Sequence, residues 1–189
     1  FLGGHRYAAT WTGDNESSWE HLKMSISMSI NMGLSGQPFS GPDIGGFEGN
    51  ATPDLFGHWN ALGTFYPFSR GLTIEGSKQH EPWAFGKKIE EVSRKAIERR
   101  YRLLPYIYTQ FYESSKSGMP VMQPAFFADI KDEKLRGEEE AFLFGPDLYI
   151  VPKWAKEVSM PAGEWKTISL IGEESEKDKY LPDVKIRPG

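Results

Sequence analysis

The sequence of 189 residues contains no cysteine. This absence excludes disulfide bonds, thiolate metal sites and a cysteine nucleophile, and it leaves the cellular compartment open. The histidines do not have the spacing of metal ligands, so we predict no metal site and expect structural or solvent-exposed roles for His5, His21, His58 and His80.

Long apolar runs and a basic excess are also missing. No stretch approaches the length of a membrane span, and the net charge of −4 gives no reason to expect nucleic acid. Hydrophobic residues at 39% and charged residues at 25% indicate a globular chain. Aromatic residues, at 14%, are abundant, which suits stacking on ring-shaped ligands as well as core packing.

Both ends of the chain have the character of internal sequence. Phe1 begins a loop or strand without a polar leader, and Gly189 follows the strand-like run Val184–Arg187. We therefore expect a fragment, a processed piece or one subunit of a divided protein. The length is enough for one domain or for one and a half small ones.

The stretch Trp11–Asn15 places one acid, Asp14, where a strand ends. Gly13 permits a sharp turn of the backbone, and Trp11 offers a flat apolar wall beside the acid. A carboxylate at the C-terminal end of a strand, before a helix, lies where α/β barrels keep their catalytic residues. The alternative interpretation is an ordinary turn with an N-cap.

Three helices are predicted from the apolar spacing. The first covers Ser17–Asn31, with Ser17 as N-cap, Gly33 as C-cap and an apolar face made of Trp19, Leu22, Met24, Ile26, Met28 and Ile30. The second covers Thr52–Gly63, with Thr52 as N-cap and Pro53 at the first position. The third runs from about Pro82 to Ser117, and Pro105 is expected to bend or interrupt it.

Short strands are predicted between these helices. One lies within 34–47 and delivers Asp43 to its end, and another covers Thr64–Phe68 before the loop Ser69–Gly71. Repeated strand, loop acid and helix favour a parallel α/β barrel. The arginines Arg99, Arg100 and Arg102 stand near several glutamates, which predicts a solvated or ion-paired face.

The pattern changes near Gly118. Strand candidates separated by Gly, Pro and charged residues indicate an antiparallel β module; they cover Val121–Phe127, Ala141–Phe144, Leu148–Val151, Trp165–Leu170 and Val184–Ile186. The polar stretch Gly172–Lys179 is interpreted as a mobile loop. We predict an α/β fold with two units: residues 1–118 as the last strands and helices of a (β/α)8 barrel, and 119–189 as part of an antiparallel β-sandwich.

Four motifs in order carry a resemblance to a known family. They are Trp11–Asn15, Gly41–Phe47, Phe65–Arg70 and Arg99–Tyr106, and 81–83 and 142–146 also fit. Together they resemble the C-terminal part of the catalytic barrel of family 31 glycoside hydrolases, the α-glucosidase family. The resemblance covers essentially the whole chain, from the end of the sixth barrel strand into the following β domain.

The resemblance implies a role for each matched residue. Asp14 matches the general acid/base, which protonates the glycosidic oxygen and then deprotonates water. Trp11 matches an aromatic wall of the sugar site, Asp43 an acid of the substrate pocket, and Phe47 an apolar contact to the sugar ring. The third motif adds Phe68 and Arg70 as substrate-binding residues. The implied chemistry needs two carboxylates and water, so no cofactor is expected.

Two departures from the family pattern bear on function. The family's nucleophile lies on an earlier strand that this sequence does not contain, and Leu72 stands where the family has a sugar-binding histidine. The leading hypothesis is a retaining α-glucosidase whose remaining barrel strands come from the same or another chain. A glucan lyase, an α-xylosidase or an α-galactosidase stays open, and the alternative from another class is a non-catalytic carbohydrate-binding or structural subunit.

Overall fold

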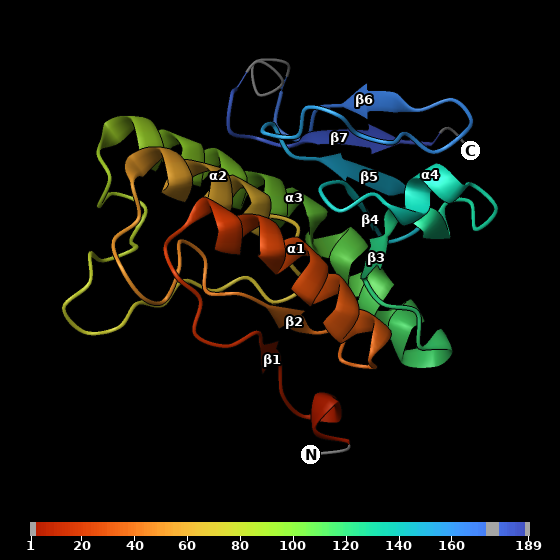
Figure 1. The fold of residues 1–189 in the computed structure, drawn as a ribbon, viewed down its shortest axis with the longest axis horizontal. Helices are drawn as coiled ribbons and strands as arrows, with labels where there is room; N and C mark the ends of the chain where they lie inside the picture. Colours follow the sequence, from red (N-terminus) through yellow and green to blue (C-terminus); the bar gives the residue numbers. More distant parts are fainter. Residues whose placement is uncertain (1–2, 173–177, 188–189) are drawn as a thin grey trace.

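The computed structural model describes residues 3–172 and 178–187, and its first part contains three long helices (Figure 1). These are α1 (Trp19–Leu34), α2 (Pro53–Gly63) and α3 (Lys87–Ser117). Two short strands, β1 (Thr10–Trp11) and β2 (Ser40–Gly41), lie side by side, and a 3-10 turn, η1 (Gly4–Arg6), precedes them. None of the helices in the described part of the chain is both long and apolar enough to cross a membrane.

The start of α1 differs from the prediction by one residue. Ser18, and not Ser17, is the N-cap, and its hydroxyl accepts a hydrogen bond from the His21 amide. Ser17 is engaged elsewhere, because its hydroxyl donates to the Gly45 carbonyl at 2.8 Å. The predicted cap at Gly33 was also wrong: Gly33 lies inside the last turn, where a Cβ would stand 2.7 Å from Pro120.

The predicted apolar face of α1 is confirmed in its centre and wrong at its margins. Leu22 and Ile26 are fully buried, whereas Trp19 and Met24 are about two-fifths exposed. In α2, Thr52 caps the helix through the Leu55 amide and Pro53 takes the first position, as predicted.

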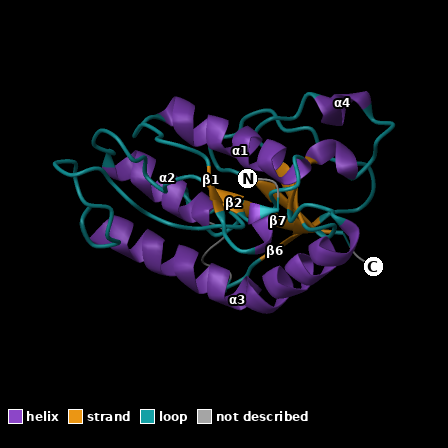
Figure 2. Ribbon diagram, turned by 90° about the horizontal axis from the view of Figure 1, so that it is seen from below, coloured by secondary structure: helices purple, strands orange, loops and turns teal. Residues whose placement is uncertain are grey.

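Helix α3 begins at Lys87, later than predicted, and runs without a break past Pro105. Its axis curves along its length, as Figure 2 shows. Pro105 lies on an exposed side of the helix, so the ring displaces no core side chain, while the neighbouring Leu103 and Ile107 remain buried. Burial of these residues stabilises the helix on both sides of the proline.

Strands β1 and β2 are parallel, with Thr10 opposite Ser40 and Trp11 opposite Gly41. The strand predicted over Thr64–Phe68 was wrong, because that segment forms turns. The segment nevertheless lies alongside β2 and the residues after it. The Phe68 amide donates to the Ser40 carbonyl at 3.0 Å, and the Ile44 amide donates to the Arg70 carbonyl at 2.9 Å.

Gly41 makes this close approach possible. A Cβ at Gly41 would lie 1.9 Å from the carbonyl oxygen of Phe68, a backbone atom that cannot rotate away. We expect Gly41→Ala to destabilise the fold by about 1–3 kcal/mol, as overpacking does, and to displace Phe68. Gly4→Ala is the control, since nothing lies within 4 Å of its Cβ position. Urea unfolding of both variants tests this, and equal stability would contradict it.

The remainder of the chain forms one antiparallel sheet in the order β3-β4-β5-β7-β6. Its strands are β3 (Met122–Pro124), β4 (Phe142–Phe144), β5 (Leu148–Val151), β6 (Lys166–Ile168) and β7 (Asp183–Ile186). All five predicted strands are present, although the first ends at Pro124 and continues as the 3-10 helix η2 (Ala125–Phe127). A short helix, α4 (Glu133–Arg136), follows, and most of the predicted loop Gly172–Lys179 lies outside the described residues.

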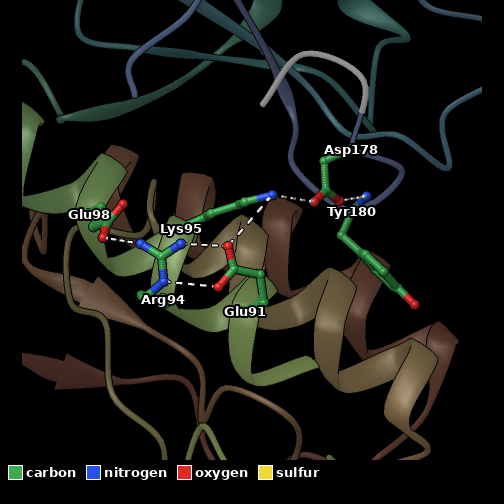
Figure 3. Close-up of polar contacts among 6 residues, drawn as sticks. All are labelled: Glu91, Arg94, Lys95, Glu98, Asp178 and Tyr180. Carbon is green, nitrogen blue, oxygen red and sulfur yellow. Dashed lines mark hydrogen bonds and ion pairs between the residues drawn. The ribbon is translucent and has the colours of Figure 1, made fainter. Parts of the chain in front are cut away.

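The sheet packs against the helices through polar as well as apolar contacts. Arg99 is 2% exposed and donates to the Pro182 carbonyl at 2.9 Å, and the Tyr106 hydroxyl donates to the Phe144 carbonyl at 2.9 Å. Lys95 on α3 also pairs with Asp178 at 3.6 Å (Figure 3). The prediction that Arg99 belongs to a solvated face was therefore wrong. The division of the chain near residue 118 stays a prediction.

Candidate active site

Asp14 lies in the loop that follows β1, where the sequence predicts it. Its side chain is exposed, and the preceding Gly13 has a φ of 101°, which is the turn conformation expected there. Three residues before Asp14, at the end of β1, Trp11 is 38% exposed. The segment from the end of β1 into this loop thus carries both an exposed carboxylate and an exposed indole.

Asp43 is the second carboxylate, and it is fully buried. One of its oxygens, Oδ1, accepts hydrogen bonds from Arg70 Nη2 at 2.7 Å and Nε at 3.1 Å. The other, Oδ2, has no hydrogen-bond partner of normal geometry among the described residues. Burial raises the pKa of Asp43, Arg70 and Trp11 act in the opposite direction, and the negative charge of Asp14 raises it further. The two carboxylates are therefore close enough to interact.

Aromatic rings surround this ion pair. Trp11 and Phe47 meet edge to face with ring centroids 6.0 Å apart. The guanidinium carbon of Arg70 stands 5.6 Å from the Trp11 ring and 5.7 Å from the Phe68 ring. The structure thus brings together all the residues that the sequence singles out for substrate binding, around the Arg70–Asp43 pair.

Asn15 organises these loops, a role that the sequence reasoning missed. It is buried, its Nδ2 donates to the Asp43 carbonyl at 2.9 Å, and its Oδ1 accepts from the Phe47 amide at 3.0 Å. One amide therefore fixes the loop of Asp14 to the loop of Asp43 and Phe47. A short amide side chain directly after the strand-end acid was the available signal.

The turn between Asp43 and Phe47 depends on two glycines. Gly45 and Gly46 have φ values of 94° and 93°, and a Cβ at Gly46 would lie 2.4 Å from the Ser17 amide nitrogen. His80 stands against this turn, with Nδ1 3.1 Å from the Ile44 carbonyl oxygen, and burial lowers its pKa. The histidine is thus a structural support, as expected.

Comparison with known proteins identifies the family. The profile described as "Glycosyl hydrolases family 31 TIM-barrel domain" matches residues 1–110. The chain belongs to glycosyl hydrolase family 31. The crystal structure of a Bacteroides thetaiotaomicron family 31 α-glucosidase is 57% identical and superposes with a TM-score of 0.89 over 100% of this chain and 31% of that one.

Two sequence relatives have related names. The chain is 49% identical over 148 residues to a probable glucan 1,3-alpha-glucosidase of Oryza sativa, and 44% identical over 170 residues to Alpha-glucosidase 2 of Bacillus thermoamyloliquefaciens. These matches cover 78% and 87% of this chain but only 16% and 22% of the relatives. The chain therefore spans about a fifth of the length of the curated family 31 proteins that it matches.

Arg100 holds the segment that carries Phe68 and Arg70. Its Nη1 donates to the carbonyls of Thr64 and Tyr66 at 2.9 and 2.7 Å, and its Nη2 donates to the Pro67 carbonyl at 3.0 Å. Burial lowers the pKa of Arg100. The solvated face predicted for this arginine was therefore wrong, and its carbonyl contacts explain why the segment turns instead of forming a strand.

We expect Arg100→Met to destabilise the protein by about 2–4 kcal/mol, because several carbonyls lose a charged donor at once. Arg102→Met is the matched control, because Arg102 lies two residues after Arg100 on the same helix and is exposed. Thermal and urea unfolding measure the difference. Similar stability of the two variants would show that Arg100 has no structural role.

Proposed function

We propose that this chain is part of a retaining glycoside hydrolase that cleaves α-linked glucosides, with Asp14 as the general acid/base. The observation that carries the proposal is the exposed carboxylate of Asp14 beside the buried Asp43–Arg70 pair and the Trp11–Phe47 wall. The α-glucosidase names of the family 31 relatives favour the same substrate class. The activity belongs to a larger protein, since the chain corresponds to a fraction of those relatives.

The reaction needs a nucleophile that this chain does not supply. A carboxylate on another barrel segment, about 5–5.5 Å from that of Asp14, attacks the anomeric carbon and forms a glycosyl ester. Asp14 donates its proton to the glycosidic oxygen, so the leaving group departs as a neutral alcohol. Asp14, now ionised, then takes a proton from water as the water oxygen attacks the anomeric carbon and the ester bond breaks.

Asp43 is better suited to binding than to attack. Its Oδ1 accepts two hydrogen bonds from Arg70 and the side chain is fully buried, so it is poorly placed to attack the anomeric carbon. Its Oδ2, which has no hydrogen-bond partner of normal geometry among the described residues, would accept a hydrogen bond from a sugar hydroxyl. Trp11, Phe47 and Phe68 would cover the apolar face of the ring.

The same proposal extends to architecture. Residues 1–118 would be the last part of a (β/α)8 barrel, and residues 119–189 part of a β-sandwich whose second sheet lies outside the described chain. Strands β1 and β2 are parallel, and each is followed along the chain by a helix, α1 after β1 and α2 after β2. This alternation of strand and helix supports a (β/α)8 barrel. The missing strands would come from the same or another chain.

A second candidate function is a non-catalytic carbohydrate-binding or structural subunit. Leu72 favours it: the side chain is 47% exposed two positions after Arg70, and leucine cannot hydrogen-bond a sugar as the histidine of the family pattern would. A missing polar contact of this kind costs about 1–3 kcal/mol, or roughly tenfold to a hundredfold in affinity or rate.

The test is an assay of the assembled barrel. This means the chain co-expressed with the remainder of the Bacteroides thetaiotaomicron α-glucosidase, the part that lies outside its match to this chain. Release of 4-nitrophenol from 4-nitrophenyl α-glucoside would support the enzyme. Maltose binding by calorimetry, without cleavage of any α-glycoside, would support the binding subunit instead.

Leu72→His tests directly whether the leucine, in place of the histidine of the family pattern, weakens sugar binding. In the assembled barrel we expect it to raise kcat/KM for α-glucosides by about tenfold to a hundredfold, because a hydrogen bond to the sugar is restored. Leu72→Gln is the control for polarity without the imidazole geometry. An unchanged or lower kcat/KM would mean that Leu72 reflects a different sugar or linkage, which a panel of 4-nitrophenyl α-glycosides would identify.

A further inference from the structure

The segment between Asp14 and helix α1 is fixed on both sides of Glu16. Asn15, the residue before it, bonds to the loop after β2 through both ends of its side-chain amide. The Ser17 amide, directly after it, donates to the Glu48 carbonyl of the same loop at 2.8 Å. The backbone amide of Glu16 is not bonded to that loop, because it donates to a side chain of α1.

His21, in the first turn of α1, supplies the acceptor. The Glu16 amide donates to the imidazole Nδ1 at 2.8 Å, while the carbonyl of Glu16 accepts from the Ser18 amide at 2.8 Å. Because a backbone amide can only donate, Nδ1 must carry a lone pair, and the proton of the neutral ring is on Nε2. The imidazole thus acts here as an acceptor for the segment that follows Asp14.

This hydrogen bond differs from an ordinary helix cap. Ser18 is the N-cap, and its hydroxyl accepts from the His21 amide. In a capping box, the side chain three positions after the cap bonds back to the amide of the cap residue itself. The His21 side chain instead bonds two residues further back, to Glu16, and the Ser18 amide already has the Glu16 carbonyl as its acceptor. The helix is thereby tied to the chain close to Asp14.

The carboxylate of Asp14 depends on its backbone for its position. The side chain is exposed, and no group among the described residues donates a hydrogen bond to it. Glu16 lies two residues further along the chain, so a shift of the Glu16 backbone reaches Asp14 through few rotatable bonds. A general acid must lie within hydrogen-bond reach of the oxygen that it protonates, and a misplacement of about 1 Å can lower a rate by about a hundredfold.

We infer that His21 is a positioning residue for Asp14, which it holds in place through the Glu16 amide. The inference rests on the catalytic role proposed for Asp14. His21 does not act on the substrate itself, and only its acceptor nitrogen takes part in the contact. A side chain that places another acceptor at the same point should therefore serve, whereas an apolar side chain should not.

His21→Ala and His21→Asn test the inference in the assembled barrel. We expect His21→Ala to lower kcat/KM for maltose by about tenfold to a hundredfold, with a smaller loss for 4-nitrophenyl α-glucoside, whose leaving group needs less protonation. His21→Asn should restore most of the rate, because its Oδ1 lies as many bonds from the backbone as Nδ1 does. His5→Ala is the control, since His5 is an exposed histidine outside α1. Equal losses in His21→Ala and His21→Asn, or no loss in His21→Ala, would overturn the inference.

Hydrogen exchange of the Glu16 amide, followed by NMR, gives a readout without catalysis. The amide should exchange faster in His21→Ala than in His21→Asn or the unmodified protein, because its acceptor is lost. His21 is partly exposed and alanine favours a helix, so the variants should fold. Equal exchange rates in all three proteins would contradict the acceptor role of His21.

A double variant separates the inference from the role of Asp14. In an Asp14→Asn background, His21→Ala should cause no further loss of rate on maltose, because the group that it positions no longer donates a proton. A loss as large as in the unmodified background would mean that His21 supports the fold in general, and would contradict the inference. If Asp14→Asn itself leaves the rate unchanged, the proposed acid/base is wrong and the inference fails with it.

Discussion

Asp14→Asn is expected to lower kcat/KM of the assembled barrel for maltose by about 10²–10⁴-fold, the usual contribution of a general acid/base. An asparagine cannot donate a proton to the departing oxygen, and maltose has a poor leaving group that needs one. Substrates whose leaving group is an acidic phenol need less protonation, so the loss in the glycosylation step should be smaller for 4-nitrophenyl α-glucoside.

The matched control for this variant is Glu16→Gln, two positions along the same loop. Glu16 is also an exposed acid, and its removal changes the loop charge equally. Steady-state kinetics of both variants on both substrates separates a catalytic proton donor from a general charge effect. Equal losses at Asp14 and Glu16, or a loss independent of the leaving group, would contradict the proposed role.

The second large effect is on stability. Arg70→Met should destabilise the fold by about 3 kcal/mol, because it leaves a buried carboxylate without its partner. The value is at the lower end for buried pairs, since the Arg70 side chain is 36% exposed while that of Asp43 is fully covered. Asp43→Asn combined with Arg70→Met should recover part of the loss, because the uncompensated charge is then gone.

The loss should depend on pH in a definite direction. Burial already raises the pKa of Asp43, and removal of Arg70 takes away the main opposing effect. The folded state then holds more protons than the unfolded chain between the two pKa values, so stability falls as pH rises through that window. Urea unfolding at pH 7.5 and 4.5 should show a smaller penalty at the lower pH, and a larger penalty there would contradict the account.

Sequence reasoning was most successful where a local pattern decides the structure. The cap at Thr52 and the five antiparallel strands follow from turn residues and short apolar runs. The placement of Asp14 and Asp43 shortly after the two parallel strands β1 and β2 follows from the short apolar runs and glycines that flank each acid. These features need no information from distant parts of the chain.

The errors occurred where distant contacts decide. Arg100 was interpreted as solvated because glutamates are its sequence neighbours, yet its acceptors are carbonyls more than thirty residues earlier. Those contacts also prevented the strand expected over Thr64–Phe68. Ser17 does not cap α1, because its hydroxyl donates a hydrogen bond to the Gly45 carbonyl instead. In each case a tertiary hydrogen bond outweighed a local preference.

The most direct test of the central claim is the anomeric configuration of the product that azide forms with Asp14→Ala in the assembled barrel. Azide needs no general base, so it intercepts a covalent intermediate that the variant cannot hydrolyse. If Asp14 is the acid/base, the intermediate still forms, two inversions occur, and the product is α-glucosyl azide. β-Glucosyl azide would mean a single inversion and would identify Asp14 as the nucleophile, which contradicts the account.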